Sequence, residues 1–204
     1  ELFEKKSSPI NSIHVSSKGR FGSTLLTSND YGWPALGYVA ENPALGSALL
    51  RSLSDRTDIE LLGSAKVLNV KSGGESVINL KINKEGLTKD WKAKLLIVAD
   101  GAKSKLREAF AIESTIKDYG QDAIVANVGF DQPHLNCAFE RFTDSGPLAV
   151  LNLLGASSQP NRCGVVWSLS PEQAKELEKS SLDEFKARLQ KEFGYRLGRI
   201  SYIG

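Results

Sequence analysis

The sequence predicts an α+β fold in which an antiparallel sheet is covered on one face by helices. Three observations predict it. The second half of the chain holds four apolar runs separated by short loops with Pro, Gly or Asp, which are 123–130, 136–142, 148–153 and 163–169. Two segments with helical periodicity follow these runs. In the first half, a series of short strand-like segments ends at Asp100-Gly101.

The first elements are a hairpin and a helix. Residues 13–16 alternate apolar and polar side chains and are expected to pair with 23–26 across a Gly-rich connection. Asn42-Pro43 then offers an N-cap and a proline for the first helical position, and Leu45, Leu49 and Leu53 recur at helical spacing. A helix is therefore predicted from this point to about Leu53.

A β-meander is predicted next, with a turn at Gly73-Gly74. Its strands are expected at 59–62, 66–71, 77–82 and 91–98. The apolar run 95–98 is typical of a strand buried on both faces. It stops at Asp100-Gly101, and a basic, helix-prone segment follows to about Phe110.

Two capping boxes mark the last helices. Ser170-Pro171-Glu172-Gln173 and Ser181-Leu182-Asp183-Glu184 each place an N-cap serine three residues before a Gln or Glu. The second helix is expected to bury one face, formed by Leu182, Phe185, Leu189 and Phe193. A boundary between two parts of the chain is predicted within 112–121.

Composition excludes some functions. The 204 residues suit one domain or one and a half. The 26 basic and 24 acidic residues are interspersed and give a net charge of +2, which argues against nucleic-acid binding. No stretch approaches the roughly 20 apolar residues that cross a bilayer, so the chain is expected to be soluble and cytoplasmic. It has no Met, begins at Glu1 and ends within a predicted strand, so we expect a fragment of a longer protein.

Few side chains suggest catalysis by the protein alone. His14 and His134 have no matching nucleophile or metal-ligand spacing, so neither a catalytic residue nor a metal site is predicted. Cys137 and Cys163 lie in apolar runs without a CxxC spacing, as small buried hydrophobes do in a reducing compartment; a disulfide between them is the alternative.

Glu140 and Arg141 are adjacent on a predicted strand and must therefore point to opposite faces of the sheet. Such a pair commonly combines a solvated charge with an inward partner. If Arg141 points inward, its guanidinium requires a carboxylate, a carbonyl or a ligand, because burying it unpaired is costly.

The Asp-Gly junction has two interpretations. In the local one, Asp100 caps a helix that begins near Ala102, and Gly101 permits the sharp turn. In the other, the junction contacts a phosphate group, because the N–H groups at a helix start favour anions. Arg107 would then add a charge-assisted contact.

Residues 100–107 read D-G-x-x-S-x-x-R, and this pattern resembles the internal Asp-Gly fingerprint of the FAD-dependent aromatic hydroxylases, the para-hydroxybenzoate hydroxylase family. Four further stretches resemble the ubiquinone-biosynthesis branch of that family; they are 139–143, 146–149, 166–168 and 193–198. The resemblance covers nearly the whole chain but only the middle portion of a family member. The family's N-terminal G-x-G-x-x-G does not occur in this sequence.

The resemblance implies a partial FAD-binding portion at 1–111 and a substrate-domain sheet with two helices at 112–204. FAD, the cofactor of the full-length parent, would be contacted by Asp100, Gly101, Ser104 and Arg107. By the same analogy Leu45 would lie beside the flavin and Val67 beside the adenine. The family has a third fingerprint, a later Gly-Asp that contacts the flavin ribose. Because this chain lacks both it and the N-terminal G-x-G-x-x-G, we expect the chain alone not to retain FAD.

The resemblance also implies a substrate site. Arg141, Gly146 and Pro147 would contact the aromatic substrate from the sheet that roofs it. The family usually continues with Leu-Pro-Leu, whereas this chain has Leu151-Asn152-Leu153, so the rim of the pocket is expected to differ.

The implied reaction is hydroxylation of a polyprenylated phenol, of the 2-octaprenyl-6-methoxyphenol type, with NAD(P)H and O2 through a flavin hydroperoxide. The isoprenoid tail implies peripheral contact with the inner face of the membrane, and a ubiquinone-biosynthesis protein complex is the implied partner. Two alternatives remain. One is a sister hydroxylase for another ubiquinone intermediate or aromatic substrate, and the other is a non-enzymatic carrier of apolar ligands.

Overall fold

The computed structural model describes residues 6–74, 77–155 and 159–204, and the fold is α+β as predicted. It contains two compact units. The first combines the residues up to Ser52 with Asp118–Gly204, and the second is Leu53–Lys117. The second unit ends at Lys117, inside the predicted boundary region 112–121, whereas the residues up to Ser52, predicted as part of the FAD-binding portion 1–111, belong to the first unit. The reason is that the N-terminal hairpin pairs with the C-terminal sheet and not with the meander.

A seven-stranded sheet dominates the first unit. Its strands are β2 (Ser12–Ser17), β3 (Ser23–Thr27), β8 (Asp122–Phe130), β9 (Cys137–Thr143), β10 (Gly146–Asn152), β11 (Arg162–Leu169) and β12 (Ile200–Ile203). Their order is β12-β8-β11-β10-β9-β2-β3. Neighbours are antiparallel except β2 and β9, which are parallel. The four apolar runs and the hairpin predicted from the sequence are therefore confirmed as strands of one sheet.

Shorter elements complete the N-terminal part of this unit. They are β1 (Ser7–Ile10), which pairs with β4 (Gly37–Ala40), the 3-10 helix η2 (Ser28–Tyr31) and helix α1 (Asn42–Ser54). Helix α1 confirms the prediction, although Asn42 is its first residue and not its cap. Glu41 supplies the carbonyl that accepts the first backbone hydrogen bonds, from Ala44 and Leu45. No residue of α1 is buried.

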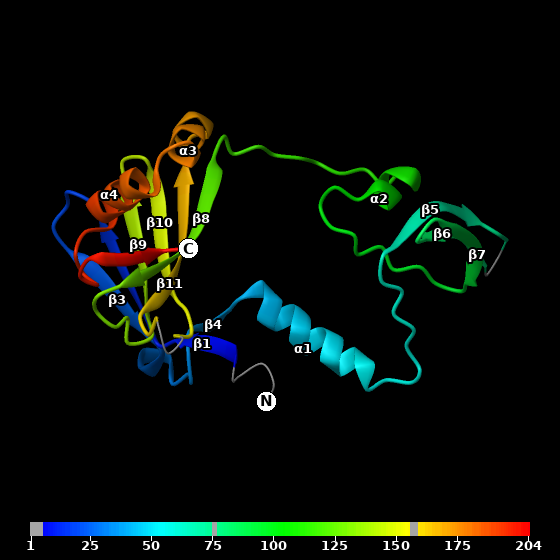
Figure 1. Ribbon diagram of the computed structural model, residues 1–204, viewed down its shortest axis with the longest axis horizontal. Helices are drawn as coiled ribbons and strands as arrows, with labels where there is room; N and C mark the ends of the chain where they lie inside the picture. The colour runs from blue at the N-terminus through cyan, green and yellow to red at the C-terminus, as the bar shows by residue number, and fades with distance from the viewer. Residues whose placement is uncertain (1–5, 75–76, 156–158) are drawn as a thin grey trace. The chain divides into compact units, whose positions relative to one another are not determined.

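Helices α3 (Pro171–Glu178) and α4 (Leu182–Phe193) lie on the same face of the large sheet (Figure 1). Both predicted capping boxes are present. The hydroxyls of Ser170 and Ser181 accept hydrogen bonds from the N–H groups of Gln173 and Glu184, whose side chains accept from the cap backbones. Each box satisfies two backbone donors that a helix start would otherwise leave free.

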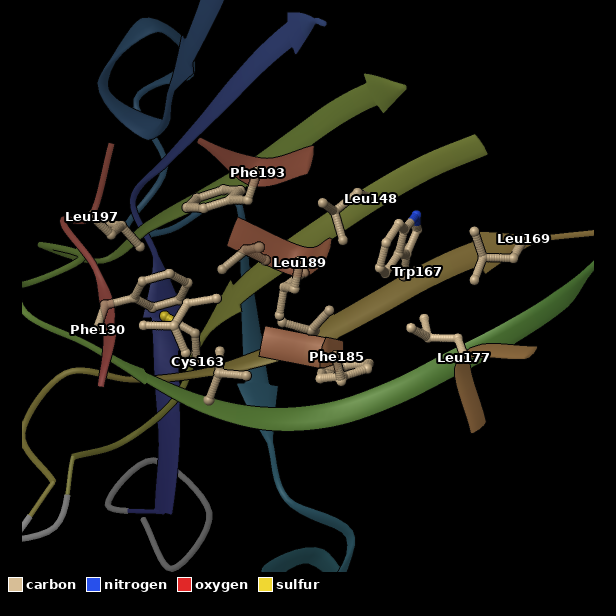
Figure 2. Packing of buried hydrophobic residues seen from close by; sticks show 14 of the residues in the cluster. Phe130, Leu148, Cys163, Trp167, Leu169, Leu177, Phe185, Leu189, Phe193 and Leu197 are labelled. Atoms are coloured by element: carbon tan, nitrogen blue, oxygen red, sulfur yellow. The ribbon is translucent and has the colours of Figure 1, made fainter. Parts of the chain in front are cut away.

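The core lies between these helices and the sheet. Figure 2 shows Phe185, Leu189 and Phe193 of α4 packed toward Leu148 and Cys163 of the strands. These three residues belong to the helix face that the sequence predicts to be buried, and they are buried. Leu182 is 69% exposed, which corrects the prediction for that position, because it is the first residue of the helix and projects beyond the core.

The second unit contains a three-stranded meander, β5 (Ala65–Ser72), β6 (Ile78–Lys84) and β7 (Leu87–Ala93), followed by helix α2 (Lys105–Ala109). The strands predicted at 66–71 and 77–82 are confirmed. No strand forms at 59–62, and the last predicted strand, 91–98, is observed as Leu87–Ala93. The predicted turn at Gly73-Gly74 is followed by residues 75–76, which lie outside the described residues.

The apolar run 95–98 is not a strand, which corrects the prediction of a buried strand. Leu95 and Ile97 are 73% and 79% exposed. A strand needs a neighbour that pairs with its backbone groups. Within the described part of this unit the three strands pair only with one another, so the apolar run alone does not produce a buried strand.

Candidate functional site

The Asp-Gly segment forms a turn before a single helical turn. Gly101 has φ +87°, and no other atom lies within 4 Å of the position that a Cβ would take. Helix α2 begins at Lys105 with Ser104 as its N-cap, and the Ser104 hydroxyl accepts the Arg107 N–H at 3.0 Å. Asp100 is therefore not the cap. It precedes the helix by too many residues to reach the free N–H groups.

Arg107 folds back onto this turn. Its Nη2 donates to the carbonyl oxygen of Ala102 at 2.8 Å. Its Nε is buried and has no hydrogen-bond partner among the described residues. A buried donor without an acceptor is costly, so this nitrogen suits an acceptor such as a phosphate oxygen. Helix α2 has five residues, so its dipole adds little to the charge of Arg107.

These observations fit an anionic group close to the turn. Gly101 leaves room for it, Arg107 offers an unused donor, and Ser104 is buried at the base of the turn. The other two predicted cofactor contacts lie on other elements. Leu45 lies on α1 in the first unit and is 39% exposed. Val67 lies on β5 in the second unit, opposite Ile82 of β6. The structure does not bring these two residues together within one unit.

The large sheet has a second face, opposite the helices. Residues directly across neighbouring strands share a face, so the register defines a row. The row runs Thr24, Val15, Glu140, Ala149, Val166 and Val125 across β3, β2, β9, β10, β11 and β8. Val125 is 71% exposed, and Phe142, two residues beyond Glu140 on the same face, is 51% exposed. We call this the second face.

Arg141 points to the helix-covered face. Its Nε donates to the carbonyl oxygen of Glu192 in α4 at 2.8 Å, and Nη1 donates to the Ser16 hydroxyl at 3.3 Å. The carbonyl partner that the sequence required is therefore present. Alternation along β9 turns the Arg141 side chain toward α4 and away from the second face. The contact between Arg141 and substrate stays a prediction.

Gly146 and Pro147 begin β10 at the β9–β10 turn. Gly146 has φ +135°, and a Cβ there would clash with the carbonyl oxygen of Ser168, so only glycine fits. Pro147 is directly opposite Phe142 and lies on the second face. Of the three predicted substrate contacts, Gly146 and Pro147 therefore lie at or on this face.

Glu140 is the residue of the second face that sequence reasoning did not select. It is half-buried, and no hydrogen bond or ion pair reaches its carboxylate from any described residue. Burial raises the pKa of this carboxyl, and no charged neighbour counteracts that shift. The available signal was alternation: Glu140 is two residues from Phe142, which pairs with Pro147.

The remaining polar candidates lie elsewhere. His14 is on the helix-covered face beside Phe139, with ring centroids 5.9 Å apart, and its pKa is lowered by burial and by the charge of Arg196. Nδ1 of His134 accepts the backbone N–H of Asn136 at 3.1 Å. Both cysteines are free, so the disulfide alternative is not realised, and burial raises the pKa of Cys163 to about 12.

Two absences hold for the described residues. Among the described residues, no group of three or more His, Cys, Asp or Glu side chains is arranged to hold a metal ion. No helix in that part of the chain has the length and apolar character needed to cross a bilayer.

Several known proteins are similar to this chain. Ubiquinone hydroxylase UbiL of Rhodospirillum rubrum is 31% identical over 83% of the chain and 37% of its own length. The mitochondrial ubiquinone biosynthesis monooxygenase COQ6 of Homo sapiens is 32% identical over 74% of the chain and 32% of its own length. The 3-demethoxyubiquinol 3-hydroxylase of Escherichia coli is 27% identical over 82% of the chain and 41% of its own length. The chain thus spans between 32% and 41% of the length of these relatives.

Solved structures share the fold at low identity. The p-nitrophenol 4-monooxygenase PnpA of Pseudomonas putida superimposes with a TM-score of 0.71 at 14% identity, over 98% of this chain and 51% of that protein. PqsL of P. aeruginosa, solved with 2-aminobenzoylacetate, gives a TM-score of 0.73 at 16% identity, over 93% and 50%.

A family profile covers most of the sequence. The family described as FAD binding domain matches residues 38–203, which include the Asp-Gly turn, Arg107 and four of the strands that form the second face, β8, β9, β10 and β11. The chain therefore belongs to the FAD binding domain family.

Proposed function

We propose that this chain is part of an FAD-dependent monooxygenase that hydroxylates a polyprenylated phenol of ubiquinone biosynthesis, with NAD(P)H and O2 as co-substrates. The observation that carries the proposal is the family match over 38–203 in a chain whose relatives include ubiquinone hydroxylases. FAD would supply the redox chemistry when bound, so the protein's own residues would bind, orient and exclude water.

Within that proposal, the turn at Asp100-Gly101 would hold the anionic part of FAD. Arg107 would donate from its unused Nε, and Ser104 would keep the turn and α2 in place. Leu45 and Val67 remain proposed contacts from helix α1 and strand β5. Gly146 and Pro147 would place the start of β10 against the aromatic substrate, with Phe142 beside them on the second face.

The isoprenoid tail of such a substrate partitions into lipid. We therefore propose that the complete enzyme acts at the inner surface of the membrane, with other ubiquinone-biosynthesis proteins as partners. The lipid solubility of the isoprenoid tail supports this part of the proposal.

A test uses the complete protein loaded with FAD. It should consume NAD(P)H in the presence of a prenylphenol and yield a product heavier by one oxygen in mass spectrometry. Asp100→Ala and Arg107→Ala should lower FAD occupancy, measured by flavin absorbance per protein, whereas Lys103→Ala, an exposed neighbour, serves as the matched control. Flavin-loaded protein that gives no hydroxylated product with any prenylphenol would contradict the substrate assignment.

A sister reaction is the second candidate, and the similarity to a 3-demethoxyubiquinol 3-hydroxylase favours it. Product analysis with prenylphenols that differ in ring substitution would distinguish the two reactions, because each predicts oxygen insertion at a different substrate.

The non-enzymatic carrier is the third candidate. An apolar groove of about 560 Å³, lined by Ile124, Leu177, Phe185 and Ile203, is the feature in its favour. A carrier would bind an isoprenoid with this chain alone and would be indifferent to Asp100→Ala. Oxygen insertion that depends on Asp100 would eliminate it.

A further inference from the structure

Glu140 stands out chemically on the second face of the seven-stranded sheet. Its cross-strand neighbours are Val15 and Ala149, and the next members of the row beyond Ala149 are Val166 and Val125. Along its own strand, the residues that share its face are Ala138 and Phe142. A carboxylate is thus surrounded by apolar side chains on a face that the helices do not cover.

No group compensates this charge. The diagonal neighbours on β2 and β10 that share the face are Ile13, Ser17, Pro147 and Leu151, and none of them titrates. Among the described residues the carboxylate has neither an ion pair nor a hydrogen bond. Arg141, the adjacent cation, is engaged on the other face with Glu192 and Ser16.

An uncompensated, half-buried carboxylate costs stability. Burial accordingly raises its pKa, and no charged neighbour contributes to that shift. Sites where a sequence breaks a packing rule without local compensation are commonly functional, because the missing partner arrives with a ligand. An ionised carboxylate only accepts hydrogen bonds, so the partner it lacks is a donor.

We propose that the Glu140 carboxylate accepts a hydrogen bond from a ring hydroxyl of the aromatic substrate, and so positions the ring over the apolar row of the second face. This inference rests on the proposed function and deepens it: the substrate is selected as a free phenol, and the corresponding methyl ether is discriminated against. Val15, Ala149 and Phe142 would contact the ring, and Glu140 would fix its rotation.

The test compares two ligands in the complete, FAD-loaded protein. A prenylphenol and its O-methyl ether differ in the one donor that Glu140 would use. Their dissociation constants are measured from the change in flavin absorbance, and kcat and KM are measured separately. The wild type should prefer the phenol by about tenfold to a hundredfold, the usual size of a hydrogen bond to a charged group.

In Glu140→Ala that preference should fall to nearly one, and Glu140→Gln should retain an intermediate preference because its amide oxygen still accepts. Glu178→Gln, an exposed change of the same kind on α3, is the control and should keep the wild-type preference. A preference that is unchanged in Glu140→Ala overturns the assignment of Glu140 while leaving the proposed function intact. A wild type that neither binds nor hydroxylates any prenylphenol overturns both.

A folding measurement excludes a merely structural role. Because ionised Glu140 is disfavoured in the folded state, Glu140→Gln should raise the midpoint of thermal unfolding at pH 7. That gain should shrink as the pH falls through the raised pKa and vanish below the ordinary value of 4.5. A lower midpoint at pH 7 would indicate that Glu140 has a stabilising partner in the protein and would overturn the inference.

Discussion

The two compact units have a similar proportion of apolar residues but bury them differently. In the first unit, α3 and α4 cover one face of the seven-stranded sheet, and Val128, Leu148 and Leu189 have no exposed surface. In the second unit, Leu80 is the one buried apolar side chain among the described residues. Apolar sequence becomes a core only where a second layer lies within reach to cover it.

The contrast extends to single residues. Leu189 and Leu95 are the same residue type, yet their exposures are 0% and 73%. Leu189 projects from helix α4 onto the strands of the seven-stranded sheet, which cover it. Leu95 follows β7, where no described strand continues the pairing.

The largest expected effect is on the core of the first unit. Leu189→Ala should lower the free energy of unfolding by about 2–5 kcal/mol, because it removes buried contacts and leaves a cavity. Leu95→Ala, the matched control in the second unit, should change it by less than about 0.5 kcal/mol. Urea unfolding measures both values, and amide hydrogen exchange assigns them to a unit. Equal losses would mean that Leu95 is buried in solution.

A smaller effect is expected at two turns. Gly146→Ala should destabilise the first unit by at least the roughly 1–3 kcal/mol of a strained φ, with an added cost for the clash against Ser168. Gly101→Ala has the strained φ without a clash, so it should cost less and only in the second unit. Thermal unfolding of the two variants provides the comparison. A Gly101 variant that is the less stable of the two would contradict it.

The smallest expected effect is a change of stability with pH. It should be confined to the first unit, because both histidines, His14 and His134, lie there. Burial lowers the pKa of each below 6.5. The unfolded chain therefore binds protons first on acidification, and stability falls as the pH drops from about 6.5 through the lowered values.

His14→Gln should reduce that loss of stability. Glu140, whose pKa is raised, changes stability with pH in the opposite sense, but it is present in both the wild type and the variant and so does not affect the comparison. Hydrogen-exchange protection between pH 7 and 5, corrected for intrinsic rates, should fall in the first unit and stay level in the second. Equal falls in both units would show that the histidines are not the cause.

Much of the fold could be predicted from local signals. The capping boxes at Ser170 and Ser181, the helix after Asn42 and the strands around Phe139 and Val165 all appear where the sequence places them. Each depends on contacts within a few residues, such as a hydroxyl that reaches the third N–H group. The prediction of an Asp-Gly turn also succeeded, because Gly101 adopts a positive φ.

The site was less predictable. The structure places the Arg141 side chain against the end of α4 and Glu140 on the apolar row, while the contact of Arg141 with substrate stays a prediction. Alternation established that the two point to opposite faces, but it could not say which face the helices cover. Asp100 was a reasonable cap by residue type, yet Ser104 takes that role because the helix begins later.

The sequence by itself determined most of the secondary structure elements, the capping boxes at Ser170 and Ser181 and the family to which they point, because these depend on short-range hydrogen bonds and on side-chain periodicity. Only the tertiary structure decided that β2 joins β9, that α3 and α4 choose one face, and that Leu95 and Ile97 stay uncovered. The β2–β9 pairing joins residues more than a hundred positions apart. All three outcomes depend on whether backbone groups and apolar surfaces find a partner that is distant in the sequence or remain in water.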